Sequence, residues 1–257
     1  MRRDGRFDKM SGMISPSPPA DMPPPALFEN VDLVILDFDG VIADSEVISL
    51  ASLQTALSEW GVDLTLDEVR ARYLGASFKT IKADLDARDA ARPTEEFGDF
   101  WHAALFARFR EELAPIPGVK NLLDRLDERK MPFCIASSGS FERIGVALDA
   151  MALTGRFDHV FSAQLVARGK PAPDLFLHAS QQVGMQPQVC LVIEDSPLGV
   201  RAAKAAGMRA IGFIGGAHLR GIQKEHRRLL LEVGADDVVG SLDSILPSPA
   251  TGGEISP

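Results

Sequence analysis

The chain has 257 residues, of which 46% are hydrophobic and 25% are charged, and its formal net charge at pH 7 is −9. This is the composition of an ordinary globular protein, and its negative charge argues against general affinity for nucleic acid or for an anionic membrane surface. No apolar run is long enough to span a membrane. The length allows one large domain, or a large domain and a smaller one.

The two ends of the chain differ in composition from the rest. Residues 1–28 are rich in Pro, Ser and Met and lack the apolar segment of a signal peptide, so we expect a disordered leader there. Residues 247–257 predict a disordered tail. Cys134 and Cys190 lie in apolar runs, which is typical of buried, reduced thiols in a cytoplasmic protein. We expect this protein to be cytoplasmic and monomeric.

The first predicted strand, residues 33–36, is a run of four apolar residues, which indicates burial on both faces of a parallel sheet. Asp37, Phe38, Asp39 and Gly40 follow it. Because strand side chains repeat every two residues, both carboxylates can point to one place beyond the carboxyl end of the strand. Such a pair can supply a nucleophile and a general acid and can bind Mg²⁺, although an acidic turn before glycine is also common.

The segment from 44 to 113 has helical periodicity and no convincing strand. Its first part repeats apolar side chains every three or four residues, at Leu50, Leu53, Leu57 and Trp60. We therefore predict an α-helical cap domain, residues 44–113, inserted into a core domain made of residues 29–43 and 114–246.

From residue 114 onward, apolar strand-like runs alternate with amphipathic helical patterns. Further strands are predicted at residues 132–136, 159–161, 189–193, 210–213 and 237–239. Repeated β–α units imply a parallel sheet covered by helices on both faces. The predicted fold class is α/β, with a Rossmann-like doubly wound parallel sheet as the core and the helical cap inserted into it.

Polar side chains follow four of these strands. Ser137–Ser140 (SSGS) opens a helix after the second strand, where hydroxyls and free amides can bind a phosphate or simply cap the helix. Two prolines stiffen the backbone around Lys170, and Glu194 and Asp195 follow the fourth strand. Because parallel strands end at one edge of the sheet, we expect all these groups near the first acidic pair. One of these motifs alone is weak evidence for a shared site, but the four motifs in this order are strong evidence.

This ordered set resembles the motifs of the haloacid dehalogenase (HAD) superfamily, in the branch of β-phosphoglucomutase-like phosphatases with a helical cap. The resemblance rests on DFDGV at 37–41, the hydroxyl motif at Ser137, GKPAPD at 169–174 and EDS at 194–196, and it extends over roughly residues 32–246. It implies a phosphoric monoester hydrolase with a Rossmann-like core, and it gives little information about the substrate.

The resemblance also implies residue roles. Asp37 would attack phosphorus and become an aspartyl phosphate, and Asp39 would act first as general acid and then as general base. Ser137 and Lys170 would complete the catalytic set, and together with Ser138 they would bind the phosphoryl oxygens.

A Mg²⁺ ion is implied as the cofactor. Its ligands would be the Asp37 carboxylate, the main-chain carbonyl of Asp39, Asp195 and, directly or through water, Glu194. Metal and lysine together would offset the charge of a phosphate in an acidic site. Dehalogenation is disfavoured, because that reaction needs no metal and this chain carries a full set of metal-binding acids.

The expected partner is a small phosphorylated metabolite, a sugar or sugar-acid phosphate, and neither nucleic acid nor a membrane. Candidate specificity residues of the cap are Glu46, Ser77 and Lys79. Two alternatives stay open: a sugar-phosphate mutase of the β-phosphoglucomutase type and, less favoured, a non-enzymatic phospho-accepting signalling domain. The mutases that this chain resembles carry a histidine, an arginine and a lysine at the positions of Ser49, Phe78 and Ser140. Their absence favours hydrolysis.

Overall fold

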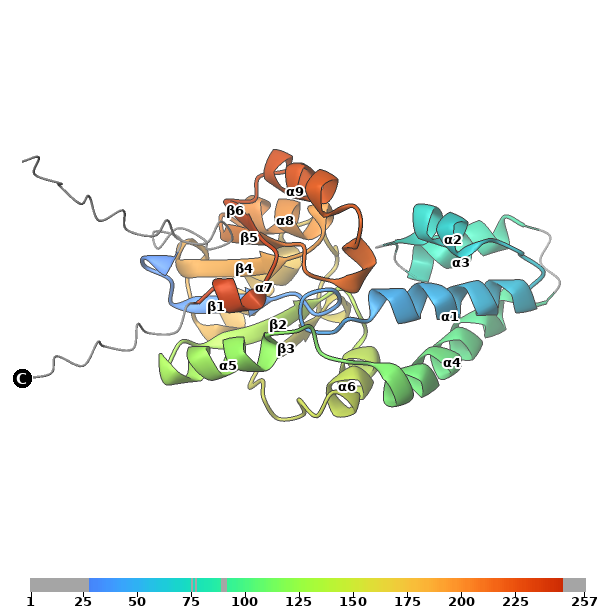
Figure 1. The fold of residues 1–257 in the computed structure, drawn as a ribbon, viewed down its shortest axis with the longest axis horizontal. Helices are drawn as coiled ribbons and strands as arrows, with labels where there is room; N and C mark the ends of the chain where they lie inside the picture. Colours follow the sequence, from blue (N-terminus) through green and yellow to red (C-terminus); the bar gives the residue numbers. More distant parts are fainter. Residues whose placement is uncertain (1–27, 75, 77, 89–91, 247–257) are drawn as a thin grey trace, which may run out of the picture.

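A computed structural model describes residues 28–74, 76, 78–88 and 92–246 of the chain. Figure 1 shows a sheet with helices on both faces and, at one end, a separate group of helices. The predicted tail and all but the last residue of the predicted leader lie outside the described residues. No helix in the described part of the chain is long and apolar enough to cross a membrane.

Six parallel strands form the sheet, in the order β3-β2-β1-β4-β5-β6. Their bounds are β1 (Leu33–Leu36), β2 (Phe133–Ser137), β3 (Val160–Ser162), β4 (Cys190–Glu194), β5 (Arg209–Phe213) and β6 (Asp237–Val239). The chain order reverses between β1 and β4, and open α/β sheets bind their ligands beyond the strand ends at such a reversal. The predicted Rossmann-like fold is confirmed.

The apolar run of β1 divides its side chains between two cores. Val34 and Leu36 belong to the cluster on one face, and Leu33 and Ile35 belong to the cluster on the other. The first face is covered by α5 (Val119–Glu128) and α6 (Phe141–Ala150), and the second by α7 (Asp174–Val183), α8 (Pro197–Ala205) and α9 (Gln223–Glu232). This two-sided burial holds β1 in place at the centre of the sheet. Cys134 and Cys190 are buried and free, as expected.

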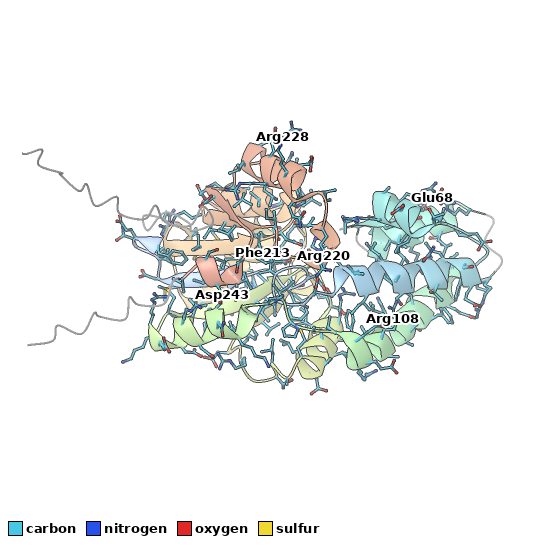
Figure 2. The ribbon with its side chains drawn as sticks, viewed as in Figure 1. Glu68, Arg108, Phe213, Arg220, Arg228 and Asp243 are labelled. Atoms are coloured by element: carbon cyan, nitrogen blue, oxygen red, sulfur yellow. The ribbon has the colours of Figure 1, made fainter. Side chains whose placement is uncertain are left out.

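Four helices are inserted between β1 and α5: α1 (Glu46–Glu59), α2 (Leu66–Tyr73), α3 (Phe78–Asp86) and α4 (Phe97–Glu112). α1 and α4 lie side by side and extend away from the sheet (Figure 1). The ring of Trp60 is fully buried and meets Phe97 edge-on, with centroids 5.3 Å apart. Arg108 of α4, labelled in Figure 2, also donates to the main-chain oxygen of Ile48 in α1 at 3.4 Å. The aromatic residues therefore build the core of the cap.

The described residues also form short 3₁₀ helices: η2 (Thr94–Glu96), η3 (Ala163–Leu165), η4 (Pro187–Val189), η5 (Ala217–Leu219) and η6 (Leu242–Ser244). The exact domain boundaries stay a prediction.

Candidate active site

The turn after β1 lies against the residues that follow β4. Asp37 donates its backbone N–H to the main-chain oxygen of Ile193 at 3.0 Å, which ties the two strand ends together. Gly40 has a φ of 82°, and a Cβ atom there would lie 1.9 Å from Oδ2 of Asp195. Both the backbone angle and the contact require glycine. The glycine of the first motif therefore lets the two acidic motifs approach each other.

Lys170 lies between the two motifs. Its Nζ atom is 2.5 Å from Oδ1 of Asp37, 2.5 Å from Oε1 of Glu194 and 3.2 Å from the main-chain oxygen of Ala136. Only 5% of its side chain is exposed. Lys170 is therefore a buried cation that pairs with two carboxylates, and not a solvated lysine of the turn.

Glu194 is fully buried and both its carboxylate oxygens accept hydrogen bonds. Besides Lys170 on Oε1, the backbone N–H and the hydroxyl of Ser196 donate to Oε2 at 2.8 and 3.0 Å. A Cβ atom on Gly199 would lie 1.6 Å from Oε1. The first turn of α8 thus leaves space for this carboxylate and orients it.

Asp37, Glu194 and Asp195 form an acidic cluster in which one oxygen from each lies within 4.8 Å of the others. Burial, followed by the charge of Glu194, raises the pKa of Asp37 and that of Asp195 well above the ordinary value, and Lys170 opposes this effect. Burial by itself lowers the pKa of Lys170, but Asp37 and Glu194 outweigh it and raise that pKa. The cluster therefore has three carboxylates and one lysine, which contacts two of them, and a cation at this place would relieve their repulsion.

Asp39 has a different set of partners. Nη2 of Arg143 lies 2.7 Å from its Oδ1 atom, Nε lies 3.4 Å from Oδ2, and the hydroxyl of Ser45 also donates to Oδ1. Burial raises the pKa of Asp39, but Arg143 and Ser45 outweigh it, and the pKa is lowered. Asp39, the second aspartate of the DFDGV motif, is therefore held ionised in this arrangement.

Arg143 was missed by the sequence reasoning. It comes from the first turn of α6, and its Nη2 atom also donates to the hydroxyl of Ser49 in α1 at 2.9 Å. Its guanidinium carbon lies 5.1 Å from the ring centre of Phe109 in α4. A cation in the first turn of a helix opposes the helix dipole, which is a sequence signal that it has an anionic partner elsewhere.

The hydroxyl motif divides its serines between different tasks. Ser140 caps α6, because its hydroxyl accepts from the backbone N–H of Arg143 at 3.2 Å. Ser137 is buried at the end of β2 and accepts from the N–H of Gly139 at 3.0 Å. Ser138 is exposed. Helix capping, the alternative to phosphate binding, therefore explains Ser140. The hydroxyl of Ser137 does not cap the helix and stays a candidate for the site.

Two histidines, also missed, contact Asp195. Nε2 of His218, in η5, lies 3.1 Å from Oδ2 of Asp195, and Nε2 of His226 lies 2.6 Å from its main-chain oxygen. His218 is 6% exposed, and burial lowers its pKa. Both follow β5 in the chain, which carries no motif that the sequence analysis singled out.

The three candidate specificity residues of the cap differ in position. Glu46 is half-buried at the start of α1, and burial, with the charge of Asp39, raises its pKa to about 7. Lys79 is exposed on α3. Ser77 lies outside the described residues. Of the two described residues, Glu46 is the one whose pKa is affected by the charge of Asp39.

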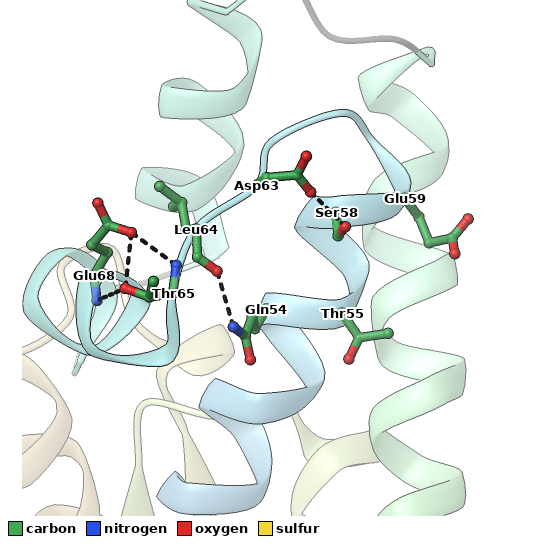
Figure 3. Close-up of a pocket in the computed structure, with 8 residues that line it drawn as sticks. All are labelled: Gln54, Thr55, Ser58, Glu59, Asp63, Leu64, Thr65 and Glu68. Carbon is green, nitrogen blue, oxygen red and sulfur yellow. Dashed lines mark hydrogen bonds between the residues drawn. The ribbon is translucent and has the colours of Figure 1, made fainter.

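A surface groove lies elsewhere on the cap, between α1 and the segment leading into α2 (Figure 3). Its polar groups bond to one another: Gln54 donates to the main-chain oxygen of Leu64 at 2.9 Å, and Thr65 and Glu68 form the capping box of α2. No predicted site residue lines it. The groove is separate from the acidic cluster.

Comparison with known proteins gives three kinds of match. Residues 34–213, more than half of the chain, match the family described as haloacid dehalogenase-like hydrolase. The chain is 32% identical over 193 residues to fructose-1-phosphate phosphatase YqaB of Escherichia coli, covering 72% of this chain and 97% of that protein. It is also 34% identical to Protein SUPPRESSOR OF QUENCHING 1, chloroplastic, of Arabidopsis thaliana, over 70% of this chain, but it spans 18% of that protein's length.

A crystal structure of similar shape is that of a HAD family hydrolase from Deinococcus radiodurans with bound phosphate and sodium. The two chains superpose with a TM-score of 0.66 and are 32% identical, over 83% of this chain and 92% of that one.

Proposed function

This chain belongs to the haloacid dehalogenase-like hydrolases and is a phosphoric monoester hydrolase, and we propose that it releases phosphate from a small phosphorylated metabolite with the help of Mg²⁺. The observation that carries the proposal is the buried acidic cluster of Asp37, Glu194 and Asp195, two of whose carboxylates, those of Asp37 and Glu194, contact Lys170. A structural ion pair would need one acid for one lysine. Three acids around one lysine suit a site that also takes a cation and a phosphoryl group.

The residues present fit Mg²⁺. The cluster offers oxygen ligands alone, which a hard divalent cation prefers, and its carboxylates are short of positive charge. Asp37, Asp195 and the main-chain carbonyl of Asp39 would hold the ion. Because both oxygens of Glu194 already accept hydrogen bonds, we propose that it acts through a water molecule. The bound ion would offset the charge of the phosphoryl group.

The protein residues would divide the chemistry as follows. An Asp37 oxygen forms a bond to phosphorus while the bond to the leaving oxygen breaks, and Asp39 donates a proton to that oxygen. Asp39 then takes a proton from water, whose oxygen attacks phosphorus and releases phosphate from Asp37. Ser137 and Lys170 would bind the phosphoryl oxygens throughout. To act as an acid, Asp39 must loosen its ion pair with Arg143, whereas the pair as it stands suits the base step.

The substrate class is a sugar or sugar-acid phosphate. Its support is the 32% identity with a fructose-1-phosphate phosphatase. The mutase alternative needs a cation for a second phosphate. Arg143 is a cation in the described site, but its guanidinium is already bound to Asp39 and Ser49. Lys79, the cation predicted in the cap, is exposed on α3. These contacts favour water as the acceptor.

Phosphate release from a panel of phosphorylated sugars, sugar acids and polyols tests the proposal. We expect multiple turnovers with Mg²⁺, none in excess chelator, and inhibition by Ca²⁺, which is larger and less strict in its geometry. Full activity in chelator would contradict the metal site. A single phosphorylation without turnover on any compound would favour the signalling alternative.

Phosphorus NMR on β-glucose 1-phosphate with a bisphosphate primer separates hydrolase from mutase. We expect release of phosphate without formation of glucose 6-phosphate. Isomerisation faster than phosphate release would overturn the hydrolase assignment.

A further inference from the structure

Asp195 is held from two sides by the segment that follows β5. His218 meets its carboxylate and His226 meets its main-chain oxygen. Within the described residues, Nδ1 of His218 is buried without a hydrogen-bond partner. A neutral ring with its proton on Nε2 can donate to Asp195 and needs no donor hydrogen bond from Nδ1, and we assign this tautomer to His218.

Two glycines make room for this imidazole. A Cβ atom on Gly216 would lie 2.7 Å from Cε1 of His218, and one on Gly40 would lie 3.0 Å from the same atom. A side chain at Gly216 would collide with the ring, and one at Gly40 would collide with the carboxylate of Asp195 as well. The backbone of both loops is thus shaped around the contact between His218 and Asp195.

The same segment also contacts the cap. Arg70, in α2, donates its guanidinium to the main-chain oxygen of His218, and the N–H of Ala217 donates to Oδ1 of Asp44 at 3.0 Å, just before α1. Figure 2 shows Arg220, the residue after η5, between the core and the beginning of α1. η5 therefore touches a proposed metal ligand on one side and the cap on the other.

We infer that η5 couples metal binding to the position of the cap, with His218 as the positioning residue for Asp195 and Arg70 as the contact from the cap. The inference rests on the metal site of the proposed function. A second residue that orients a metal ligand typically changes metal affinity about 10–100-fold. Coupling is reciprocal, so a cap held closed by Arg70 would favour Mg²⁺ binding, and bound Mg²⁺ would favour the closed cap.

The dissociation constant for Mg²⁺, measured by calorimetric titration without substrate, tests both halves. His218→Leu removes the donor, and we expect affinity to fall at least about tenfold. His218→Gln places an amide N–H near the Nε2 position, and we expect it to restore most of the affinity. If His218→Leu does not fold, His218→Asn replaces it in the comparison with His218→Gln, because the shorter Asn amide cannot reach Asp195. His159→Leu, at an exposed histidine, is the matched control.

Arg70→Met should weaken Mg²⁺ binding by about fivefold or more, and Arg72→Met, on the exposed side of the same helix, should not. Unchanged affinity in His218→Leu, or an equal loss in the Gln and Asn variants, would overturn the positioning role. Unchanged affinity in Arg70→Met would overturn the coupling to the cap. A chain that shows these effects on Mg²⁺ but hydrolyses no phosphomonoester would refute the proposed function alone.

Discussion

The two carboxylates that follow β1 are two residues apart and have different surroundings. Asp37 is bound by Lys170 and lies among Glu194 and Asp195, all of which belong to the sheet edge. Asp39 is bound by Arg143 and Ser45, and Arg143 also contacts Ser49 and Phe109 in the inserted helices. The charges that shift the pKa of Asp37 therefore all belong to the core, whereas Arg143, which acts on Asp39, also contacts α1 and α4. This difference suits a nucleophile that is always in place and an acid–base group that responds to cap closure.

The largest expected effect comes from removing the charge of Asp37. Asp37→Asn keeps the shape of the side chain but leaves no attacking carboxylate, so kcat should fall by about 10⁴-fold or more. The melting temperature should not fall, because the neutral amide relieves repulsion from Glu194. Asp32→Asn, at the exposed position just before β1, is the control. Near-normal kcat in Asp37→Asn would refute the covalent mechanism.

Next comes Lys170, the cation on the Asp37 side. Lys170→Met should reduce kcat by about 10²–10³-fold. Without metal it should also lower the free energy of unfolding by about 3 kcal/mol, because it leaves buried carboxylates unpaired. Urea unfolding measures this, and Lys204→Met, which breaks a surface ion pair with Asp236, should cost at most about 1 kcal/mol. If both variants lost the same free energy of unfolding, Lys170 would contribute no more than an ordinary surface ion pair.

Arg143, the cation on the Asp39 side, should have a smaller effect. We expect Arg143→Met to reduce kcat about 10–100-fold, with partial recovery in Arg143→Lys. Because Arg143 helps to lower the pKa of Asp39, its removal should move the acidic limb of the pH–rate profile to higher pH. Arg108→Met, which removes an ion pair with Glu112 within α4, is the control. An unchanged acidic limb would mean that Arg143 does not act through Asp39.

The smallest effect concerns Glu46 and is a matter of stability. Its pKa rises from 4.5 to about 7 on folding, so the folded chain binds more protons than the unfolded chain between these values. Stability associated with this group is thus present below pH 4.5 and is lost as the pH rises through 7.

Glu46→Gln should remove this dependence. In metal-free urea unfolding, the variant should gain about 1–2 kcal/mol relative to wild type between pH 4.5 and 8, because a half-buried carboxylate keeps some hydration. Glu59→Gln, exposed at the end of α1, should gain nothing. A parallel pH dependence in the wild type and Glu46→Gln would contradict the raised pKa.

The order of residues along the chain is enough to predict the sheet and the groups along its carboxyl edge. Strand period and apolar runs located all six strands to within a residue or two, and parallel strands end at one edge. Asp37, Lys170, Glu194 and Asp195 therefore had to meet there, because each directly follows a strand or is fixed in the turn beyond one.

The residues that surround that edge are brought there by the packing of helices and loops in the folded chain. Arg143 reaches Asp39 because α6 packs beneath α4, and His218 reaches Asp195 because η5 folds back between β4 and the cap. These contacts join residues 104 and 23 positions apart through loops and helix packing, where no short period relates one partner to the other. Motif spacing records the geometry of a strand and its turn, whereas the docking of the cap depends on the shape of many side chains together.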